Sequence, residues 1–282
     1  MKTTTRFTSL FLLASILLAV SCKKTDNIAA VAPEDQTTLE LSTGQAVADN
    51  ATEDANAIFM EAAAIKNLLG SNTQSVITTN SLSGASVSVT PANGFPKTIV
   101  INFGTGYTTP NGITHTGKIN VLISDSVRKP GSTSVITFTN YYVNGFKKEG
   151  TITWTNTSTA STKGWQRKVE NGKITAPDGR YWLHNGIRDA VQIAGANTPN
   201  TLLDDVFLIT GNHTVTNAAG KTKNAYITEA LQKKAVCDNI GSGKLKLEGD
   251  NHYAVIDFGN GECDKIATIS IDGTGPKTIT LR

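Results

Sequence analysis

The stretch TIVINFG, residues 98–104, places apolar side chains at every second position, at Ile99, Ile101 and Phe103. Four further stretches repeat this alternation: 119–123, 136–138, 244–248 and 267–271. A period of two with one polar face is typical of strands that bury one side only, and such strands pair in antiparallel fashion. The sequence therefore predicts a mainly β chain from about residue 85 onward.

Dipeptides that favour tight turns separate these stretches. Six of them are Asn-Gly or Asp-Gly pairs: 144–145, 171–172, 178–179, 185–186, 260–261 and 272–273. Both pairs accept the positive φ angles that two-residue hairpin turns require. We therefore expect an antiparallel meander of long hairpins that forms a sandwich or a partial barrel.

The alternating stretch at 98–104 has an internal counterpart. VINFGTG at residues 100–106 matches VIDFGNG at residues 255–261 nearly position for position, and a second alternating stretch follows each copy. Two copies are too few for a solenoid, which needs three or more repeats. We expect either a duplicated β unit, with parts at about 85–160 and 161–282, or a chance similarity between two hairpins.

One segment, from Thr52 to Leu69, has the periodicity of an amphipathic helix. Its apolar positions are Ala55, Ile58, Phe59, Ala62, Ile65 and Leu69. Asn50 or Thr52 is suited to cap the start, and Gly70 to end the helix. We expect a single N-terminal α-helix whose apolar stripe packs on the sheet; the alternative is a helix that binds a partner.

Residues 1–21 have the parts of a secretory signal peptide. Lys2 and Arg6 give a positive start, and residues 7–20 form an apolar run interrupted only by small hydroxyl residues. The run is shorter than the roughly 20 apolar residues that a membrane span needs. The segment is therefore predicted to be removed rather than to form part of the fold.

The cleavage region, LAVSC at residues 18–22, resembles a lipobox, although Ala19 stands where Leu is usual. In that case Cys22 receives a diacylglyceryl group and its freed amine an acyl chain such as palmitate, and several chains together anchor stably. The alternative is an ordinary secretory signal with a chance cysteine. Lys23 follows Cys22 in place of an Asp that would favour inner-membrane retention, so we expect a lipoprotein of the outer membrane, with its domain in the periplasm or on the cell surface.

The remaining chain is polar at its start and nearly neutral in total. Residues 22–46 lack apolar periodicity and are predicted to be a disordered tether before a domain at 47–282. Loss of Lys2 and Arg6 lowers the formal charge from +3 to +1. This balance excludes the basic excess that nucleic-acid binding demands.

Beyond Cys22 the chain has two cysteines, Cys237 and Cys263. In an oxidising compartment an even pair favours a disulfide, and the alternative is two buried thiols. Two cysteines without clustered histidines do not complete a tetrahedral metal shell.

Several segments resemble a family of uncharacterised lipoproteins of the Bacteroidota. They are CKK (22–24), INFGTG (101–106), FTNYYVNGFKKEGT (138–151) and IDFGNGECD (256–264). The resemblance covers most of the chain after the signal peptide. It implies an envelope location and an all-β fold, and it carries no known activity.

Few residues in this sequence point to chemistry. His115, His184, His213 and His252 lie far apart in the chain, and each is expected to be a surface or strand residue. Asp257 and Asp264 flank one turn, where they cap backbone groups, offer oxygens to calcium, or serve as the carboxyl pair of a glycoside hydrolase. Three further carboxylates are Asp189, Asp204 and Asp205. No other cofactor is indicated.

Aromatic residues between 141 and 182 give the remaining indication. Neighbours in a strand point to opposite faces, so one ring of Tyr141-Tyr142 and one of Tyr181-Trp182 is expected to face outward. Tyr142, Trp165, Tyr181 and Trp182 are therefore candidate ligand-binding residues. The first hypothesis is a non-enzymatic lipoprotein that binds a glycan or an envelope protein or has a structural role. The second is a glycan-active hydrolase that uses carboxylates near Asp257 and Asp264.

Overall fold

The computed structural model describes residues 33–70, 82, 84–198, 201–249 and 251–281. All of them belong to one unit, residues 32–282. The expected signal peptide, Cys22 and the first part of the expected tether, up to residue 32, lie outside the described residues.

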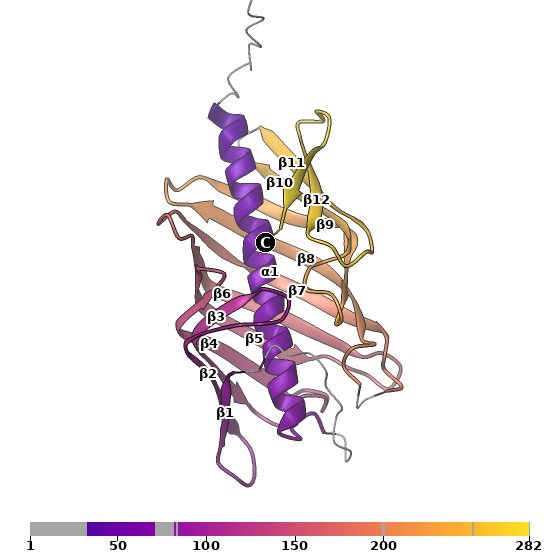
Figure 1. The fold of residues 1–282 in the computed structure, drawn as a ribbon. Helices are drawn as coiled ribbons and strands as arrows, with labels where there is room; N and C mark the ends of the chain where they lie inside the picture. Colours follow the sequence, from indigo (N-terminus) through magenta and orange to yellow (C-terminus); the bar gives the residue numbers. More distant parts are fainter. Residues whose placement is uncertain (1–32, 71–81, 83, 199–200, 250, 282) are drawn as a thin grey trace, which may run out of the picture. The chain divides into compact units, whose positions relative to one another are not determined.

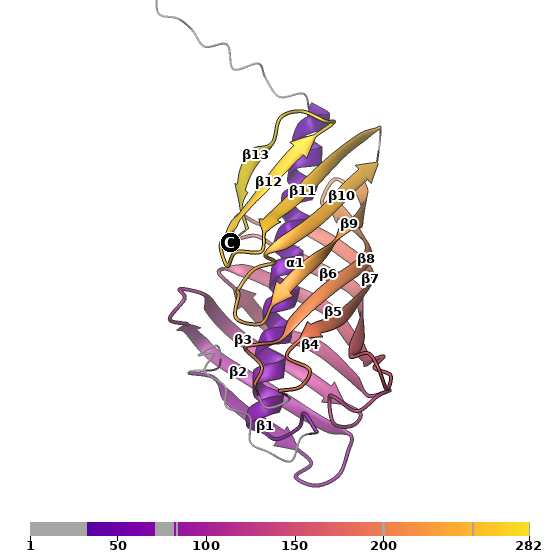
Figure 2. The same cartoon turned by 90° about the vertical axis from the view of Figure 1, so that its right-hand side faces the viewer.

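Thirteen strands in the described residues form one antiparallel sheet, in which each strand pairs with its neighbours in the sequence (Figure 2). The strands are β1 (Ser86–Thr90), β2 (Lys97–Thr108), β3 (Thr114–Ile123), β4 (Thr133–Val143), β5 (Phe146–Asn156), β6 (Gly164–Thr175), β7 (Tyr181–Ala194), β8 (Val206–Asn217), β9 (Thr222–Lys234), β10 (Ser242–Gly249), β11 (His252–Asn260), β12 (Ile266–Ile271) and β13 (Lys277–Thr280). β1 and β13 are the two edges, so the sheet is not closed. The expected mainly β fold, an antiparallel meander with one N-terminal helix, is confirmed.

The single helix of the described residues, α1, runs from Pro33 to Ile65. The expected tether is therefore wrong for residues 33–46, which are helical. Thr52 is also not a cap: it lies inside the helix, and its Oγ1 donates to the carbonyl oxygen of Ala48 at 2.7 Å. Pro33 suits the first helical position, because no helical hydrogen bond needs the missing N–H there.

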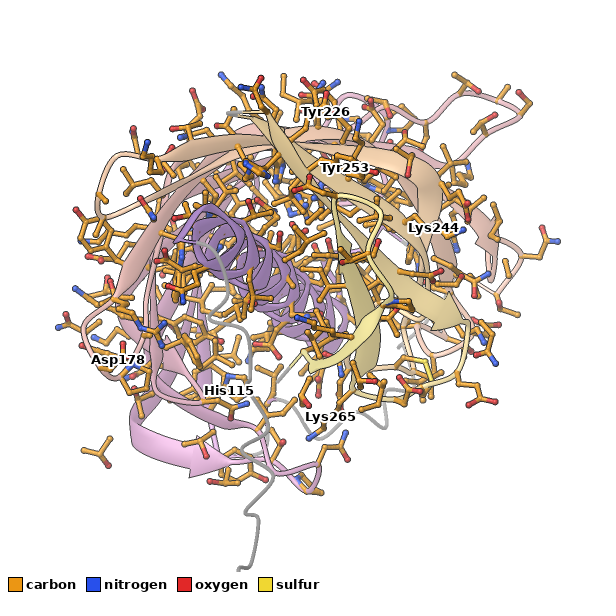
Figure 3. All side chains as sticks on the ribbon, turned by 90° about the horizontal axis from the view of Figure 1, so that it is seen from above. His115, Asp178, Tyr226, Lys244, Tyr253 and Lys265 are labelled. Carbon is orange, nitrogen blue, oxygen red and sulfur yellow. A yellow bond between two sulfur atoms is a disulfide. The ribbon has the colours of Figure 1, made fainter. Side chains whose placement is uncertain are left out.

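The sheet curves around α1, which runs along its inner side (Figures 1 and 3). The helix contacts β6, β7, β8, β9, β11 and β12. Apolar and polar residues of α1 are therefore both buried, among them Leu41, Ser42, Gln45, Asp49, Ala55, Ile58 and Phe59. Small residues permit a close approach: a Cβ added at Gly44 would lie 2.6 Å from the indole ring of Trp182. The expected packing of the helix on the sheet is confirmed.

The helix ends four residues before the expected Leu69. The amide of Leu68 donates to the carbonyl oxygen of Ala63 at 2.7 Å, and the amide of Asn67 donates to that of Ala64 at 3.0 Å. With Asn67 at a φ of 57°, this is a Schellman motif. Asn67 thus ends the helix in the role that was expected of Gly70.

Three of the six turn dipeptides lie in hairpin turns as expected: Asn144-Gly145, Asp178-Gly179 and Asp272-Gly273. Asn260-Gly261 instead leads into the longer connection between β11 and β12.

The remaining two dipeptides, at 171–172 and 185–186, lie inside β6 and β7, so the prediction of a turn there is wrong. The register of β5 and β6 shifts between Glu149 and Thr151. Gly150, between them, has a φ of 104°, and a Cβ there would lie 2.5 Å from the carbonyl oxygen of Asn171. Such bulges bend long strands, which lets the sheet curve around the helix.

The two similar stretches have the same local structure. Asn102 Oδ1 accepts a hydrogen bond from the amide of Gly104, and Asp257 Oδ1 accepts one from that of Gly259, both at 2.9 Å. They lie in β2 and β11, near opposite ends of the sheet. β5 and β6 pair across residue 160, so one sheet connects the two copies.

Candidate ligand-binding cavity

A cavity of about 400 Å³ lies between the C-terminal half of α1 and the sheet. Its larger apolar lining residues include Phe59, Met60, Ile113, Val127, Trp154, Trp165, Leu202, Leu203, Phe207, Ile209 and Val236. Its ionisable lining comprises Glu53, Asp54, Glu61, His115, Asp205, Lys233 and Asp238. Pockets for small molecules measure roughly 300–1,000 Å³ and are mostly apolar with a few polar groups, which fits this site.

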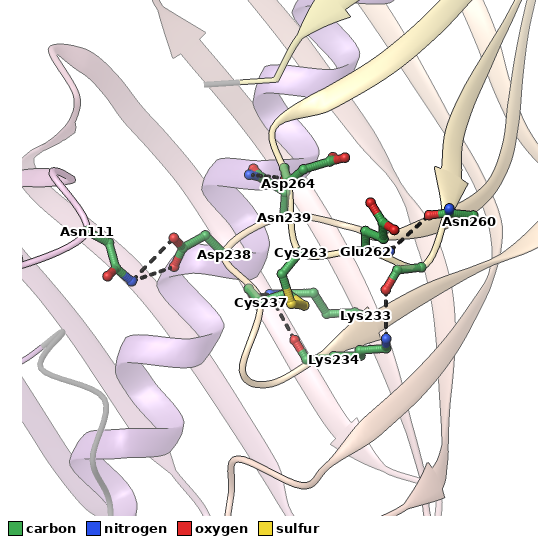
Figure 4. Close-up of a disulfide and its surroundings, with 11 residues drawn as sticks. Asn111, Lys233, Lys234, Cys237, Asp238, Asn239, Asn260, Glu262, Cys263 and Asp264 are labelled. Carbon is green, nitrogen blue, oxygen red and sulfur yellow. Dashed lines mark hydrogen bonds between the residues drawn. A yellow bond between two sulfur atoms is a disulfide. The ribbon is translucent and has the colours of Figure 1, made fainter.

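Two segments from distant parts of the sheet meet beside the cavity. Asn111, between β2 and β3, donates through Nδ2 to both carboxylate oxygens of Asp238 at 3.4 Å (Figure 4). Asp238 lies between β9 and β10, and both residues line the cavity. The contact therefore joins two connections whose strands do not pair directly with each other.

A disulfide between Cys237 and Cys263 holds the segment that contains Asp238 (Figure 4). The Cα atoms of the cysteines lie 5.0 Å apart, and the bond closes a loop over 26 residues. A loop of that length stabilises the fold by about 3.5 kcal/mol on the chain-entropy model. The expected disulfide is confirmed, and it ties one wall of the cavity to the connection between β11 and β12.

Four buried charged residues adjoin the cavity, and we call them the interior charge cluster: Asp49 and Glu53 of α1, Arg167 of β6 and Arg188 of β7. Arg188 NH2 donates to Asp49 Oδ2 at 2.8 Å, and its NH1 lies 2.7 Å from Oδ1. Arg167 NH1 donates to Glu53 Oε1. Charged side chains are rarely buried without partners, and here each cation has a carboxylate.

The strand register explains why α1 supplies two acids at this point. Arg167 and Arg188 are directly opposite each other in β6 and β7. Like charges in such a pair repel. Asp49 and Glu53 are one helical turn apart and so share a face of α1, which places two carboxylates against the two guanidinium groups.

Three further basic residues flank the interior charge cluster. The Lys148 ammonium donates to Thr52 Oγ1 at 2.7 Å and lies 3.1 Å from His184 Nε2. Burial, and then the Arg167 charge, lower the pKa of Lys148 to about 7. Burial, together with neighbouring cations, also lowers the pKa values of His184 and His213 well below their ordinary value. Both imidazoles are therefore neutral at pH 7.

His115 is the third buried histidine. Its Nδ1 lies 2.9 Å from the hydroxyl of Tyr141, which donates to Asp54 Oδ2 at 3.2 Å. Phe103 stacks on the imidazole with a centroid distance of 4.9 Å. All four histidines are strand residues, as expected, but only His252 is partly exposed.

Asp205 is a titratable group in the cavity wall. Burial raises the pKa of this carboxyl to about 7, against the opposing effect of the Arg128 charge. Gln192 Nε2 donates to Asp205 Oδ1 at 2.7 Å, and Arg128 NH2 lies 3.8 Å from Oδ2. The cavity wall thus favours the protonated form of the acid more than water does.

Asp205→Asn is expected to stabilise the protein at pH 8 by about 1–2 kcal/mol more than at pH 5, once solvent screening is allowed for. The unfolded carboxyl titrates near its ordinary pKa of 3.8, so the folded chain binds the extra proton between about pH 4 and 7. Stability therefore falls as pH rises through this window. Urea unfolding at both pH values measures the difference. Asp189→Asn, an exposed control on β7, should change stability by less than about 0.5 kcal/mol; an equal gain from Asp205→Asn at both pH values would contradict the expectation.

The structure separates the four candidate aromatic residues. Trp165 lines the cavity, where its ring lies edge-on to Phe207 with a centroid distance of 5.8 Å. Trp182 is buried against α1. Tyr142 and Tyr181 are half-buried on the opposite face from their neighbours, as strand alternation predicts. Of the four, Trp165 alone belongs to the cavity lining.

The candidate carboxylates Asp257 and Asp264 accept hydrogen bonds from nearby backbone amides. Asp257 Oδ1 accepts from Gly259, and Asp264 Oδ1 accepts from the amide of Ile266, each at 2.9 Å. Neither belongs to the lining of the cavity. Within the described ranges, no group of three or more His, Cys, Asp or Glu side chains is placed to hold a metal ion. These two residues act as turn caps, the first of the three roles expected for them.

Comparison of the chain with known protein families, curated proteins and solved structures finds no match. In the part of the chain that the structure describes, no helix is long and apolar enough to cross a membrane.

Sequence reasoning did not single out most of the cavity. Asp205 was noted only as one of several carboxylates. The cavity lining comes from α1 and from segments between residues 109 and 238, which strand pairing brings together. Alternation along one strand predicts the face of a residue, but it does not predict which distant residues share a cavity.

Proposed function

We propose that this protein is a lipoprotein of the outer membrane whose cavity binds a small, mostly apolar molecule. The observation that carries the binding proposal is the cavity of about 400 Å³ between α1 and the sheet. It combines aromatic and aliphatic walls with several ionisable groups, which is the composition of ligand pockets. The proposal is of a binding protein rather than an enzyme.

The location rests on the N-terminal sequence. A positive start, a short apolar run and the LAVSC stretch at 18–22 support export and lipid attachment at Cys22. The resemblance to Bacteroidota lipoproteins supports the same assignment. Ten residues, 23–32, separate Cys22 from the start of α1 at Pro33, so only a short segment would link the lipid to the folded unit.

Cys22→Ser is expected to release the protein from the membrane fraction, because serine cannot carry the thioether-linked diacylglyceryl group. The measurement is cell fractionation, together with incorporation of labelled palmitate. Cys263→Ser, which leaves Cys22 in place, is the control and should stay in the membrane fraction. Unchanged sedimentation and labelling of the Cys22 variant would contradict the lipid anchor.

The cavity is expected to bind a neutral apolar fluorophore such as N-phenyl-1-naphthylamine, with quenching of Trp154 or Trp165 emission. Ala190 lines the cavity and is opposite Trp165 in the sheet. Ala190→Phe should fill part of the space and weaken binding at least tenfold. Ala194→Phe, at an exposed position on the same strand, should change the affinity less than twofold. Equal binding by both variants would place the probe outside the cavity and remove the basis for the proposal.

A further inference from the structure

The ionisable side chains of the cavity lining already have partners in the protein. Glu53 forms an ion pair with Arg167, and Asp205 Oδ1 accepts a hydrogen bond from Gln192 at 2.7 Å. Interactions within the protein also engage the other five ionisable lining residues: Asp54, Glu61, His115, Lys233 and Asp238. A charged group on a ligand would therefore have to compete with an existing contact.

Burial adds a second cost for a charged ligand. An ion that leaves water without a partner is strongly disfavoured, whether it is a cation or an anion. The face of an aromatic ring attracts cations, but the ring of Trp154 already has the guanidinium carbon of Arg167 5.6 Å from its centroid. The lining thus offers neither an amine nor a carboxylate a replacement for its water.

Two neutral polar side chains of the lining are available instead. Ser134 of β4 is 4% exposed, and Asn56 of α1 is half-buried. Within the described ranges, neither side chain forms a hydrogen bond with the rest of the protein. Most buried side-chain polar atoms have a hydrogen-bond partner, so an unpaired hydroxyl in a cavity wall is an unusual feature.

Both neutral groups lie beside aromatic side chains of the same cavity. Ser134 is directly opposite Trp154 in the pairing of β4 and β5. Asn56 precedes Phe59 by three positions on α1, so the two share a face of the helix. A ligand whose polar group meets Ser134 or Asn56 can therefore place its apolar body against an aromatic ring.

We infer that the cavity selects an uncharged molecule with an apolar body and one hydroxyl or carbonyl group, and rejects amines and carboxylates of similar shape. This inference rests on the proposed binding function and names the chemical class of its ligand. A serine hydroxyl and an asparagine amide can each donate and accept, so either can bind a hydroxyl or a carbonyl group.

Four probes of similar size test the inference: butylbenzene, 3-phenylpropan-1-ol, 3-phenylpropan-1-amine and 3-phenylpropanoate. They compete with N-phenyl-1-naphthylamine for the chain from Cys22 onward, purified with the substitution Cys22→Ser. We expect the alcohol to bind at least tenfold more tightly than the amine and the carboxylate at pH 7.5.

The butylbenzene result separates the two proposals. If butylbenzene displaces the fluorophore but the alcohol does not, or if either charged probe binds as tightly as the alcohol, the inference is overturned and the cavity function stands. If butylbenzene does not displace the fluorophore, the proposed cavity function fails as well.

Substitutions in the lining test the assignment to these two residues. Ser134→Ala and Asn56→Leu should each weaken binding of the alcohol at least threefold, because a hydrogen bond is lost, and change butylbenzene binding less than twofold. Ser132→Ala is the matched control. Ser132 also lines the cavity, but its hydroxyl already donates to the carbonyl oxygen of Val127 at 3.0 Å, so the ratio of the two affinities should stay within twofold. An unchanged ratio in both Ser134→Ala and Asn56→Leu would overturn the assignment.

Discussion

Asp49→Ala is expected to lower the free energy of unfolding by about 3–5 kcal/mol, the usual cost when one partner of a buried ion pair is removed. The substitution leaves Arg188 without its carboxylate partner while its side chain stays 1% exposed. It also removes the carboxylate oxygen that lies 3.8 Å from Nδ1 of His213. Urea unfolding at pH 7, followed by circular dichroism, measures the loss.

Asp178→Ala is the matched control. Asp178 also forms an ion pair, with Arg180 at 2.8 Å, but both side chains are more than half exposed. Surface pairs contribute only about 0–1 kcal/mol, so this variant should be nearly unchanged. The double variant Asp49→Leu with Arg188→Met should lose less stability than Asp49→Ala, because it removes both charges. A loss below 1 kcal/mol for Asp49→Ala would mean that the interior charge cluster is hydrated rather than dry.

Ile58→Ala is expected to cost about 2–5 kcal/mol, the range for truncating a buried isoleucine. Ile58 is fully buried between α1 and the sheet. Ile65→Ala is the matched control on the same helix, because Ile65 is 47% exposed and should cost less than about 0.5 kcal/mol. Thermal and urea unfolding of both variants measure the difference. Similar losses for the two would mean that the helix does not pack in the sheet as described.

The strands were predictable because most of them obey one simple rule. Ile99, Ile101 and Phe103 alternate in the sequence, and all three are buried in β2. The rule holds wherever the inner face of the sheet meets apolar side chains. The disulfide was equally predictable, since Cys237 and Cys263 are the only two cysteines after Cys22.

The first half of the helix was missed because the sheet surrounds it. A helix on a protein surface has one apolar and one polar face, and its periodicity shows in the sequence. α1 buries Ser42, Gln45 and Asp49 as well as Leu41, so residues 33–46 have no regular apolar stripe. The periodicity appears only where Ile58 and Phe59 meet the apolar part of the sheet.

The interior charge cluster was hidden by an inverted strand. On β7, Leu183, Ile187 and Val191 are at least 39% exposed, while His184 and Arg188 are 1% exposed. Reading that strand by hydropathy would bury the wrong face. The reason is tertiary, because the acids that make Arg188 tolerable inside come from α1, 139 residues earlier in the chain. No local pattern contains that information.

Each strand of the sheet pairs with its neighbours in the sequence, but the contacts of the helix are with strands far along the chain. Each hairpin forms from adjacent residues, whereas α1 contacts strands as far along the chain as β11 and β12. During synthesis the helix emerges first, and the wall that covers it is completed last. Its buried acids, amides and hydroxyls are unusual in a folded core. They suit a segment that must stay in water until more than 200 later residues have been made.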